Sequence, residues 1–352
     1  MDRMDRVVTL RRRHRLFLAL SLSRQRVYRD RENPLECLDD GELQRRFRFT
    51  RDGIFFITSL VALDIEPATR RSQSLPSSLQ VLLTLQFLAT GNFLITAGDV
   101  VNVHEATACR VVHRVVAALC KRVGKFVRWP RGEEIARAQH QFYQLASFPG
   151  VVGAVDGTHV RIQAPSAHET AFVNRKNYHS INVQLIAGAD CKILDVVANW
   201  PGATHDSRIL RESTIGRELE AGVHTGLLLG DSGYPCKRWL MTPFLQPRNR
   251  AQEKYNASHS TTRALVERTI GQLKRRFHCL HSELRVLTKH TCPIIVACCV
   301  LHNIAKDFGS EVQEADSDND HDPDYDPQLV SSYEGRQDGF MYRDAIVRQH
   351  FT

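Results

Sequence analysis

The chain has 352 residues and is 42% hydrophobic, so it is long and apolar enough to bury one large core or two smaller ones. Its nine cysteines are odd in number and include no Cys-x-x-Cys pair, which argues against a disulfide scaffold or a standard zinc module and indicates a reducing compartment. The net charge is +8 although residues 311–326 carry eight acids and no Lys or Arg, so the rest of the chain is strongly basic, which suits either a phosphate-rich partner or ordinary solubility.

The N-terminal end of the chain is rich in arginine, with ten arginines and three aspartates in residues 1–31. A short apolar run at residues 16–22 is followed at once by arginines, so we do not expect secretion. No apolar run approaches the roughly 20 residues of a membrane span, so we expect no membrane contact. Residues 1–34 are interpreted as a basic N-terminal arm. The arm is expected to be a solvated terminus, a loose helix or a nuclear-import patch. We expect a nuclear protein, with the cytoplasm as a second location.

Residues 35–130 are predicted to form a helical region. Apolar residues recur there at helical spacing, and Asp39 or Asp40 and Thr50 are suited to cap the first two helices. The predicted helices cover residues 39–49, 50–63, 79–89, 96–101, 105–122 and, after a Pro-Arg-Gly break, 133–145.

Within this region, residues 79–123 have the spacing of a helix-turn-helix. On its last helix, four valines and a leucine are expected to face inward. The side chains expected to face outward are Glu105, Thr107, Ala108, Arg110, His113 and Arg114. Because Arg110 and Arg114 lie one turn apart, we predict that they contact DNA in a major groove. The alternative is a plain helical bundle that braces the core.

Two apolar segments that end in an acid come next. Residues 151–162 are mostly β-branched and predict a buried strand, which Asp156 interrupts. Such a carboxylate is costly unless it is paired or binds a cation, so Asp156 is either a structural acid or part of a metal site. Residues 226–230 repeat the design before Asp231 and a Ser-Gly turn. The other predicted strands, which pair as a hairpin, cover residues 181–187 and 192–199.

Glu267 lies on a helix predicted over residues 262–277 from its apolar stripe. With Asp156 and Asp231 it would complete an all-oxygen site of the kind that Mg²⁺ or Mn²⁺ prefers. Two ions held in this way can activate a water and stabilise a leaving oxygen in phosphodiester cleavage.

The neighbours of Glu267 support a site but also allow a simpler interpretation. Gly271 is expected to leave space for an ion beside the carboxylate, and Lys274 to hold a phosphate. The alternative is a surface acid paired with Arg263, which contributes only about 0.3–0.5 kcal/mol.

Several polar segments surround these acids. Arg175 and Lys176 lie in a polar loop, where they either bind phosphate or are plain surface charge. Asp206 begins a predicted helix, where an acid is stabilised by about 0.3–1 kcal/mol. The remaining predictions are a loop over residues 237–256, a closing helix over 290–308, disorder over 311–327 and one short helix within 336–352.

Six motifs stand out between residues 35 and 308: Asp156-Gly-Thr-His159, Asn174-Arg-Lys-Asn-Tyr-His-Ser180, Trp200-Pro-Gly-Ala-Thr-His-Asp206, Gly230-Asp-Ser-Gly-Tyr-Pro235, Glu267-Arg-Thr-Ile-Gly-Gln-Leu-Lys-Arg-Arg-Phe277 and Ala297-Cys-Cys-Val-Leu-His-Asn303. Their identity and order resemble the PIF/Harbinger transposases and the Harbinger transposase-derived nucleases of host genomes. One departure is Ile270, where that family usually has Phe, and the position stays apolar.

The resemblance implies a DDE superfamily endonuclease of the α/β class, with an RNase H-like core preceded by an all-α region that carries the helix-turn-helix. It implies Asp156, Asp231 and Glu267 as the catalytic triad, which holds Mg²⁺ or Mn²⁺, and Asp206 as a fourth metal ligand. It also favours phosphate contact by Arg175 and Lys176. The expected division of the chain is a basic arm 1–34, a helical region 35–130, a nuclease core 150–308 and an acidic, mostly disordered tail 309–352.

We therefore expect a divalent-metal-dependent DNA endonuclease, with strand transfer as a further activity. The rival hypothesis is a domesticated DNA-binding or scaffold protein without catalysis, and the presence of all three acids favours the enzyme. An RNase H-type enzyme acting on RNA stays open, although a helix-turn-helix favours duplex DNA. The resemblance also implies a Myb/SANT-like DNA-binding partner protein, and a homo-oligomer is a further expectation.

Overall fold

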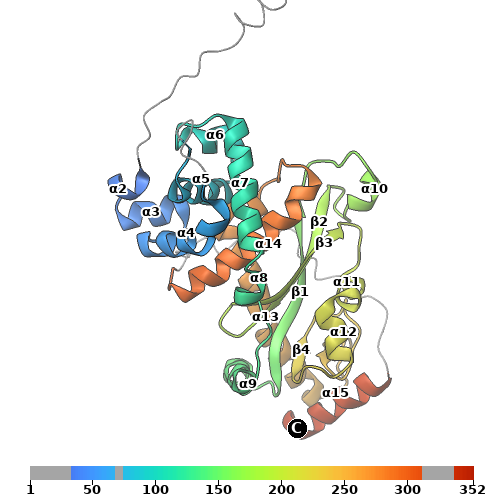
Figure 1. Cartoon of the computed structure of the whole chain (residues 1–352). Coiled ribbons are helices and arrows are strands. Elements are labelled where there is room, and N and C mark those ends of the chain that lie inside the picture. Colours follow the sequence, from blue (N-terminus) through green and yellow to red (C-terminus); the bar gives the residue numbers. More distant parts are fainter. Residues whose placement is uncertain (1–32, 68–73, 311–336) are drawn as a thin grey trace, which may run out of the picture. The chain divides into compact units, whose positions relative to one another are not determined.

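The computed structural model describes residues 33–67, 74–310 and 337–352 (Figure 1). Nearly all of the predicted arm, residues 1–34, and the segment predicted to be disordered, residues 311–327, lie outside the described residues. The described residues pack as one unit that combines helices with a five-stranded sheet, which confirms the predicted α/β class. Among these residues, none of the helices is both long enough and apolar enough to cross a lipid bilayer.

The sheet is built around one long strand. Its strands are β1 (Val151–Arg161), β2 (Ser180–Ala187), β3 (Ile193–Pro201), β4 (Leu227–Leu229) and β5 (Leu240–Met241). They lie in the order β3-β2-β1-β4-β5. The pairings β1–β2 and β2–β3 are antiparallel, which confirms the predicted hairpin, whereas β4 pairs parallel with β1 and β5 with β4. β1 therefore lies at the centre, between the hairpin and the parallel pair.

The region before the sheet is helical, as predicted. Its helices are α2 (Pro34–Cys37), α3 (Asp40–Phe47), α4 (Arg51–Ile65), α5 (Ser77–Thr90), α6 (Leu94–Asp99), α7 (Glu105–Cys120), α8 (Val123–Phe126) and α9 (Glu133–Ala146). The Asp39 carboxylate accepts a hydrogen bond from the Glu42 amide at 2.7 Å and caps α3, and Thr50 caps α4 through the Gly53 amide. These local signals determine where both helices begin.

Helices cover both faces of the sheet (Figure 1). The elements after β1 also include α10 (Glu169–Phe172), α11 (Asp206–Glu212), α12 (Thr214–Glu220), α13 (Arg250–Arg276), the 3₁₀ helix η1 (His278–Leu280), α14 (Thr288–Asp307) and α15 (Gln337–His350). α13 and α14 pack on one face through the main hydrophobic core, which continues into the helical region. Leu210 and Ile215 of α11 and α12 cover the other face through a smaller apolar cluster that includes Val155 of β1.

α7 connects the helical region to the rest of the fold (Figure 1). It packs against α4, α5 and α6, and also against α14, which in turn contacts β3. Its predicted apolar stripe is buried, but so is Ala108, which was wrongly predicted to face outward. A β-carbon added to Gly98 of α6 would lie 3.5 Å from the Ala108 side chain, so the two helices meet closely at small residues. The two helices and the intervening turn are present, and their DNA-binding role stays a prediction.

The segment 237–256, predicted to be a loop, instead contains β5 and the start of α13. α13 is 27 residues long, and Asn249 caps its first turn by accepting a hydrogen bond from the Gln252 amide at 3.0 Å. The prediction failed because Tyr255 is the only large apolar residue in the first three turns, which leaves no stripe to recognise. Tyr255 is itself fully buried, so tertiary packing defines this part of the helix.

The predicted tail covers residues 309–352, and its last part, α15, is a helix that packs on the rest of the fold. Arg343 of α15 donates hydrogen bonds to two backbone carbonyls that follow β5, at 3.0 and 3.2 Å. The Phe351 ring lies 5.7 Å from the ring of Phe148, centroid to centroid. The short helix expected within 336–352 is confirmed, and residues 311–336 of the tail lie outside the described residues. Contacts with distant segments order this helix, and local composition does not reveal them.

Candidate active site

Four acids named from the sequence come together beside β1. Asp156 lies in β1, Asp231 follows β4, Asp206 begins α11 and Glu267 lies in α13. Burial raises the pKa of Asp156 and repulsion from the other three carboxylates raises it further, so all three lie within electrostatic reach of Asp156. These four residues are called the acid cluster below. Their assembly agrees with the sequence analysis, and their catalytic role stays a prediction.

The parallel pairing of β1 with β4 places Asp156 beside Asp231. Ala154 of β1 pairs with Leu229 of β4, and each acid stands two residues further along the chain. The Gly233 amide donates a hydrogen bond to Asp231 Oδ1 at 3.0 Å and fixes its carboxylate in the turn. The two acids therefore take adjacent positions in space, but only Asp231 lies in a turn after its strand. Asp156 lies within β1, which continues to Arg161, so the expectation that its apolar segment ends at the acid was wrong.

Gly157 makes room for Asp206. A β-carbon on Gly157 would lie 2.6 Å from the carboxyl carbon and oxygens of Asp206, closer than real contacts allow. Asn182 of β2 holds the same carboxylate, because its Nδ2 donates to Asp206 Oδ1 at 2.7 Å and to the Thr204 carbonyl at 2.8 Å. Asp206 therefore does more than stabilise a helix N-terminus, since a glycine and an amide on neighbouring strands hold it against β1.

Tyr234 is a member of the site that the sequence analysis did not single out. Its side chain is 3% exposed, and its hydroxyl has no hydrogen-bond partner among the described residues. Burial raises the pKa of this phenol well above its ordinary value, and the negative charges of Asp206, Asp156 and Asp231 raise it further. A β-carbon on Gly230 would lie 3.0 Å from the Tyr234 ring, so this glycine leaves space for the ring. The only sequence signal is the tyrosine's place in the turn after Asp231.

Arg263 of α13 joins two acids of the cluster. Its Nη1 donates to Asp156 Oδ2 at 2.9 Å, and its Nη2 donates to Glu267 Oε1 one helical turn away. The guanidinium side chain is only 10% exposed, against 13% for Asp156 and 37% for Glu267. The pair with Glu267 that the sequence suggested as a surface contact is present, but it is part of the buried site.

The acid cluster resists full ionisation. Burial, opposed by Arg263 and reinforced by the other acids, raises the pKa of Asp156 to about 7. Burial also raises the pKa of Asp206, despite its hydrogen bond from Asn182, and that of Asp231, despite the nearby Arg263 charge. Crowded, partly desolvated carboxylates of this kind are stabilised by an added positive charge.

The residues of the acid cluster fit a divalent cation in donor type and in charge. Carboxylate oxygens are the ligands that Mg²⁺ and Mn²⁺ prefer, and a cation would relieve their mutual repulsion. Within the part of the chain that the structure describes, however, no three His, Cys, Asp or Glu side chains are gathered closely enough to hold a metal ion. Arg263 supplies the positive charge between two of the acids instead.

Two of the predicted phosphate-binding residues lie in a loop near the acid cluster. Arg175 and Lys176 are exposed, in a loop braced by the Asn174 side chain, which accepts a hydrogen bond from the Lys176 amide at 2.9 Å. The positive charge of Arg175 lowers the pKa of both Asp206 and Asp231, against the larger effect of burial, which places it close to the acid cluster.

One expectation for α13 was wrong. Lys274 is 7% exposed, because it lies on the face of the helix that also buries Ile270 and Leu273, so little of it is accessible to a phosphate. Gly271 does have open space around it, and the use of that space by an ion stays a prediction. A β-carbon there would touch only the tip of the Arg275 side chain, at 3.9 Å.

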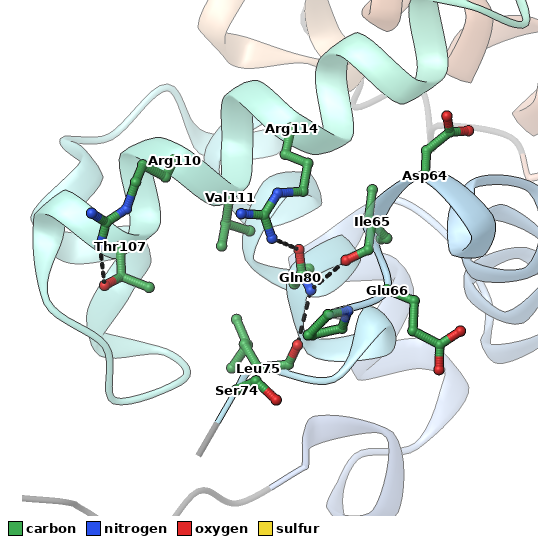
Figure 2. Close-up of a pocket in the computed structure, with 11 residues that line it drawn as sticks. Asp64, Ile65, Glu66, Ser74, Leu75, Gln80, Thr107, Arg110, Val111 and Arg114 are labelled. Carbon is green, nitrogen blue, oxygen red and sulfur yellow. Dashed lines mark hydrogen bonds between the residues drawn. The ribbon is translucent and has the colours of Figure 1, made fainter. Parts of the chain in front are cut away.

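Arg110 and Arg114 line a pocket of about 490 Å³ between α7, the end of α4 and the start of α5. Figure 2 shows Arg114 turned toward Gln80 of α5, to whose Oε1 it donates a hydrogen bond at 3.3 Å. Arg110 donates to the Thr107 hydroxyl, also at 3.3 Å. Both arginines are exposed as predicted, but their guanidinium groups contact different neighbours.

Comparison with known proteins gives consistent matches. Residues 155–303, which include the whole acid cluster, match the family model described as a DDE superfamily endonuclease. The human protein named "Putative nuclease HARBI1" is 36% identical over 283 residues, covering 79% of this chain and 81% of its own length. Its Xenopus laevis counterpart is 29% identical, covering 90% and 92%. "Protein ALP1-like" of Arabidopsis thaliana is 28% identical, covering 77% and 72%. No solved structure matches the chain.

Proposed function

The chain belongs to the Harbinger transposase-derived nuclease family of DDE superfamily endonucleases, and we propose on that basis that it cleaves phosphodiester bonds of duplex DNA with a divalent metal ion. The observation that carries the proposal is the acid cluster, in which acids from two strands and two helices are forced together against their own repulsion. Such an arrangement costs folding free energy, and a site that binds a cation is the usual reason to keep it.

Asp156, Asp231 and Asp206 would hold the cation, with Glu267 at the more exposed edge of the site. When bound, a divalent ion supplies the positive charge that activates a water and stabilises a leaving oxygen. Arg175 and Lys176, in the exposed loop next to the site, bind backbone phosphates of the DNA, and Asn182 orients Asp206. The buried Tyr234 ring fills space behind the three aspartates and excludes water from that side.

Two features of the fold support this assignment. The antiparallel strands β1, β2 and β3, followed by the parallel strands β4 and β5, fit the RNase H-like core that the family resemblance implies. α6 and α7 fit a helix-turn-helix in which Arg110 and Arg114 contact DNA. A nuclear location, a Myb/SANT-like partner and a homo-oligomer belong to the same proposal.

The second candidate is a DNA-binding or scaffold protein without catalysis. The observation that favours it is Arg263, whose guanidinium occupies the space between Asp156 and Glu267. If that arginine never leaves, the cluster is a structural ion-pair network on an otherwise DNA-binding surface.

A nicking assay on supercoiled duplex DNA with Mg²⁺, Mn²⁺, Ca²⁺ or EDTA separates the two candidates. We expect cleavage with Mg²⁺ or Mn²⁺ that EDTA abolishes and that Asp156→Asn or Asp231→Asn removes. Asp195→Asn is the matched control, since Asp195 is a buried aspartate of β3 whose raised pKa owes nothing to the acid cluster. Wild-type protein that binds DNA but does not nick it in any metal would support the scaffold hypothesis.

A further inference from the structure

Arg263 is a buried arginine in contact with two members of the acid cluster. It reaches Asp156, 107 positions earlier in the chain, and Glu267 on its own helix, and only 10% of its side chain is exposed. A guanidinium that is buried to this degree differs from the exposed arginines and lysines that give the chain its surface charge. Two partly buried carboxylates on separate elements would repel each other, and the guanidinium fork offers one N–H to each.

The same geometry conflicts with a divalent ion. Arg263 and a metal ion would both be positive, and both would need the facing oxygens of Asp156 and Glu267. Like charges at such a separation repel strongly when little water screens them. The guanidinium therefore takes the place between Asp156 and Glu267 that a metal ion would need.

We propose that Arg263 is a positioning residue that holds Asp156 and Glu267 in place until a divalent cation arrives, and that the cation displaces it from at least one of them. The inference rests on the proposed metal-dependent function. It assigns Arg263 two opposite effects, because the arginine stabilises the metal-free fold while it competes with the metal for the same oxygens.

Arg263→Gln separates these two effects. Glutamine preserves helix propensity and hydrogen bonding but removes the charge. Without metal, the variant should unfold at a lower temperature than the wild type, because the two carboxylates lose their counter-ion. With metal, it should bind more tightly, because the ion no longer competes with a bound cation. We expect Mn²⁺ affinity to rise at least about tenfold, because the repulsion between a dication and a neighbouring unit charge reaches this size even where water screens it well.

The measurements are isothermal titration of full-length protein with Mn²⁺, and thermal unfolding in EDTA and in saturating Mn²⁺. Neither depends on cleavage. Arg276→Gln is the matched control, since Arg276 is a buried arginine of the same helix whose guanidinium donates to the backbone carbonyls of Arg48 and Ser310. That variant should lose thermal stability and keep wild-type Mn²⁺ affinity.

Arg263→Lys tests the same point while preserving the charge. One ammonium group cannot span both carboxylates as the guanidinium does, so its Mn²⁺ affinity should lie between the wild type and Arg263→Gln. If Arg263→Gln folds only when Mn²⁺ is present, the inference is also supported, because the metal then replaces the missing counter-ion.

The outcomes are distinct. Wild type that binds Mn²⁺ while Arg263→Gln binds it equally or more weakly overturns the inference and leaves the proposed metal site intact. Tight binding by Arg263→Gln with none by the wild type supports it in its strongest form. Absence of Mn²⁺ binding by the wild type and by both Arg263 variants removes the metal-dependent function, and the inference with it.

Discussion

At the scale of single residues, small side chains make the acid cluster possible. Gly157 leaves the space that the Asp206 carboxylate occupies, and Gly230 leaves the space for the Tyr234 ring. Neither glycine has a positive φ, so backbone freedom is not the reason for its presence. Their role is the close approach of neighbouring groups, which a methyl group would prevent.

Gly157→Ala should therefore damage the site directly. The added methyl would overlap the Asp206 carboxylate, which must move, so we expect a loss of about 1–3 kcal/mol in unfolding free energy. DNA nicking should fall at least about tenfold, because displaced metal ligands are costly even when the shift is small. Urea unfolding and the nicking assay measure the two effects.

Gly124→Ala is the control, because no heavy atom lies within 4 Å of a β-carbon added there. It should match the wild type in both assays. A Gly157→Ala protein with wild-type stability and nicking would show that Asp206 does not need this position.

The raised pKa of Asp156 predicts a pH dependence of stability in EDTA. Its carboxyl has a pKa of about 7 in the fold, mainly because it is buried, against an ordinary value of 3.8. The folded state therefore holds the proton more tightly than the unfolded state, and stability falls as pH rises from about 4 to about 7. Asp156→Asn cannot ionise, so its stability relative to the wild type should increase over this range by up to about 4 kcal/mol.

Urea unfolding of both proteins between pH 4 and pH 8 measures that difference. The comparison between the two isolates Asp156 from other titrating groups. A stability difference that stays constant with pH would mean that Asp156 is ionised in the fold throughout, held by Arg263.

At the scale of secondary-structure elements, α7 shows how one helix serves two surfaces. Its buried valines pack toward α5 and α14, while Arg110 and Arg114 stay exposed on the pocket side (Figure 2). The hydrogen bond from Arg114 to Gln80 holds one arginine against α5, and Gln80 is itself anchored to the carbonyls of Ile65 and Leu75. A DNA phosphate would therefore have to replace Gln80 as the partner of Arg114.

Replacing Arg110 and Arg114 with Ala should weaken duplex DNA binding and flatten its salt dependence. Each lost phosphate contact lowers the slope of log affinity against log salt by about 0.9, so two contacts would lower it by nearly two. Fluorescence anisotropy over a range of salt concentrations measures this. Arg45 and Arg46, two exposed arginines of α3, form the control pair. Equal slopes for both double variants would make α7 a structural helix.

At the scale of the whole molecule, the C-terminal helix α15 completes the fold around the end of the sheet. Ile346, Val347 and Phe351 are buried in the main core, and Arg343 satisfies backbone carbonyls after β5. Deletion of residues 337–352 should therefore lower the unfolding free energy by about 3–6 kcal/mol, mainly from the exposed apolar surface.

Chemical denaturation of the shortened protein tests this expectation. Met341→Ala is the control, because Met341 lies on the same helix but is 65% exposed, and it should be nearly neutral. Unchanged stability after the deletion would mean that α15 only rests on the surface.

The sequence by itself determined the features that depend on neighbours in the chain. Caps at Asp39 and Thr50 marked where two helices begin. Runs of β-branched and other apolar residues marked β1 and the hairpin of β2 and β3. The identity and order of six motifs indicated the family. The apolar runs identified Asp156 and Asp231 because the first acid lies within its strand and the second follows its strand closely. Such signals are local, since hydrogen bonding at a helix end or along a strand involves residues a few positions apart.

Only the tertiary structure decided which side chains meet. The contact between Arg263 and Asp156, the fit of Asp206 over Gly157, and the burial of Lys274 and Ala108 join segments that no local pattern connects. The first turns of α13 and the packing of α15 were missed for the same reason. A sequence encodes which face of an element is apolar, but the burial and charge of each atom depend on what packs against that face, because desolvation and electrostatic energies are set by distance in space.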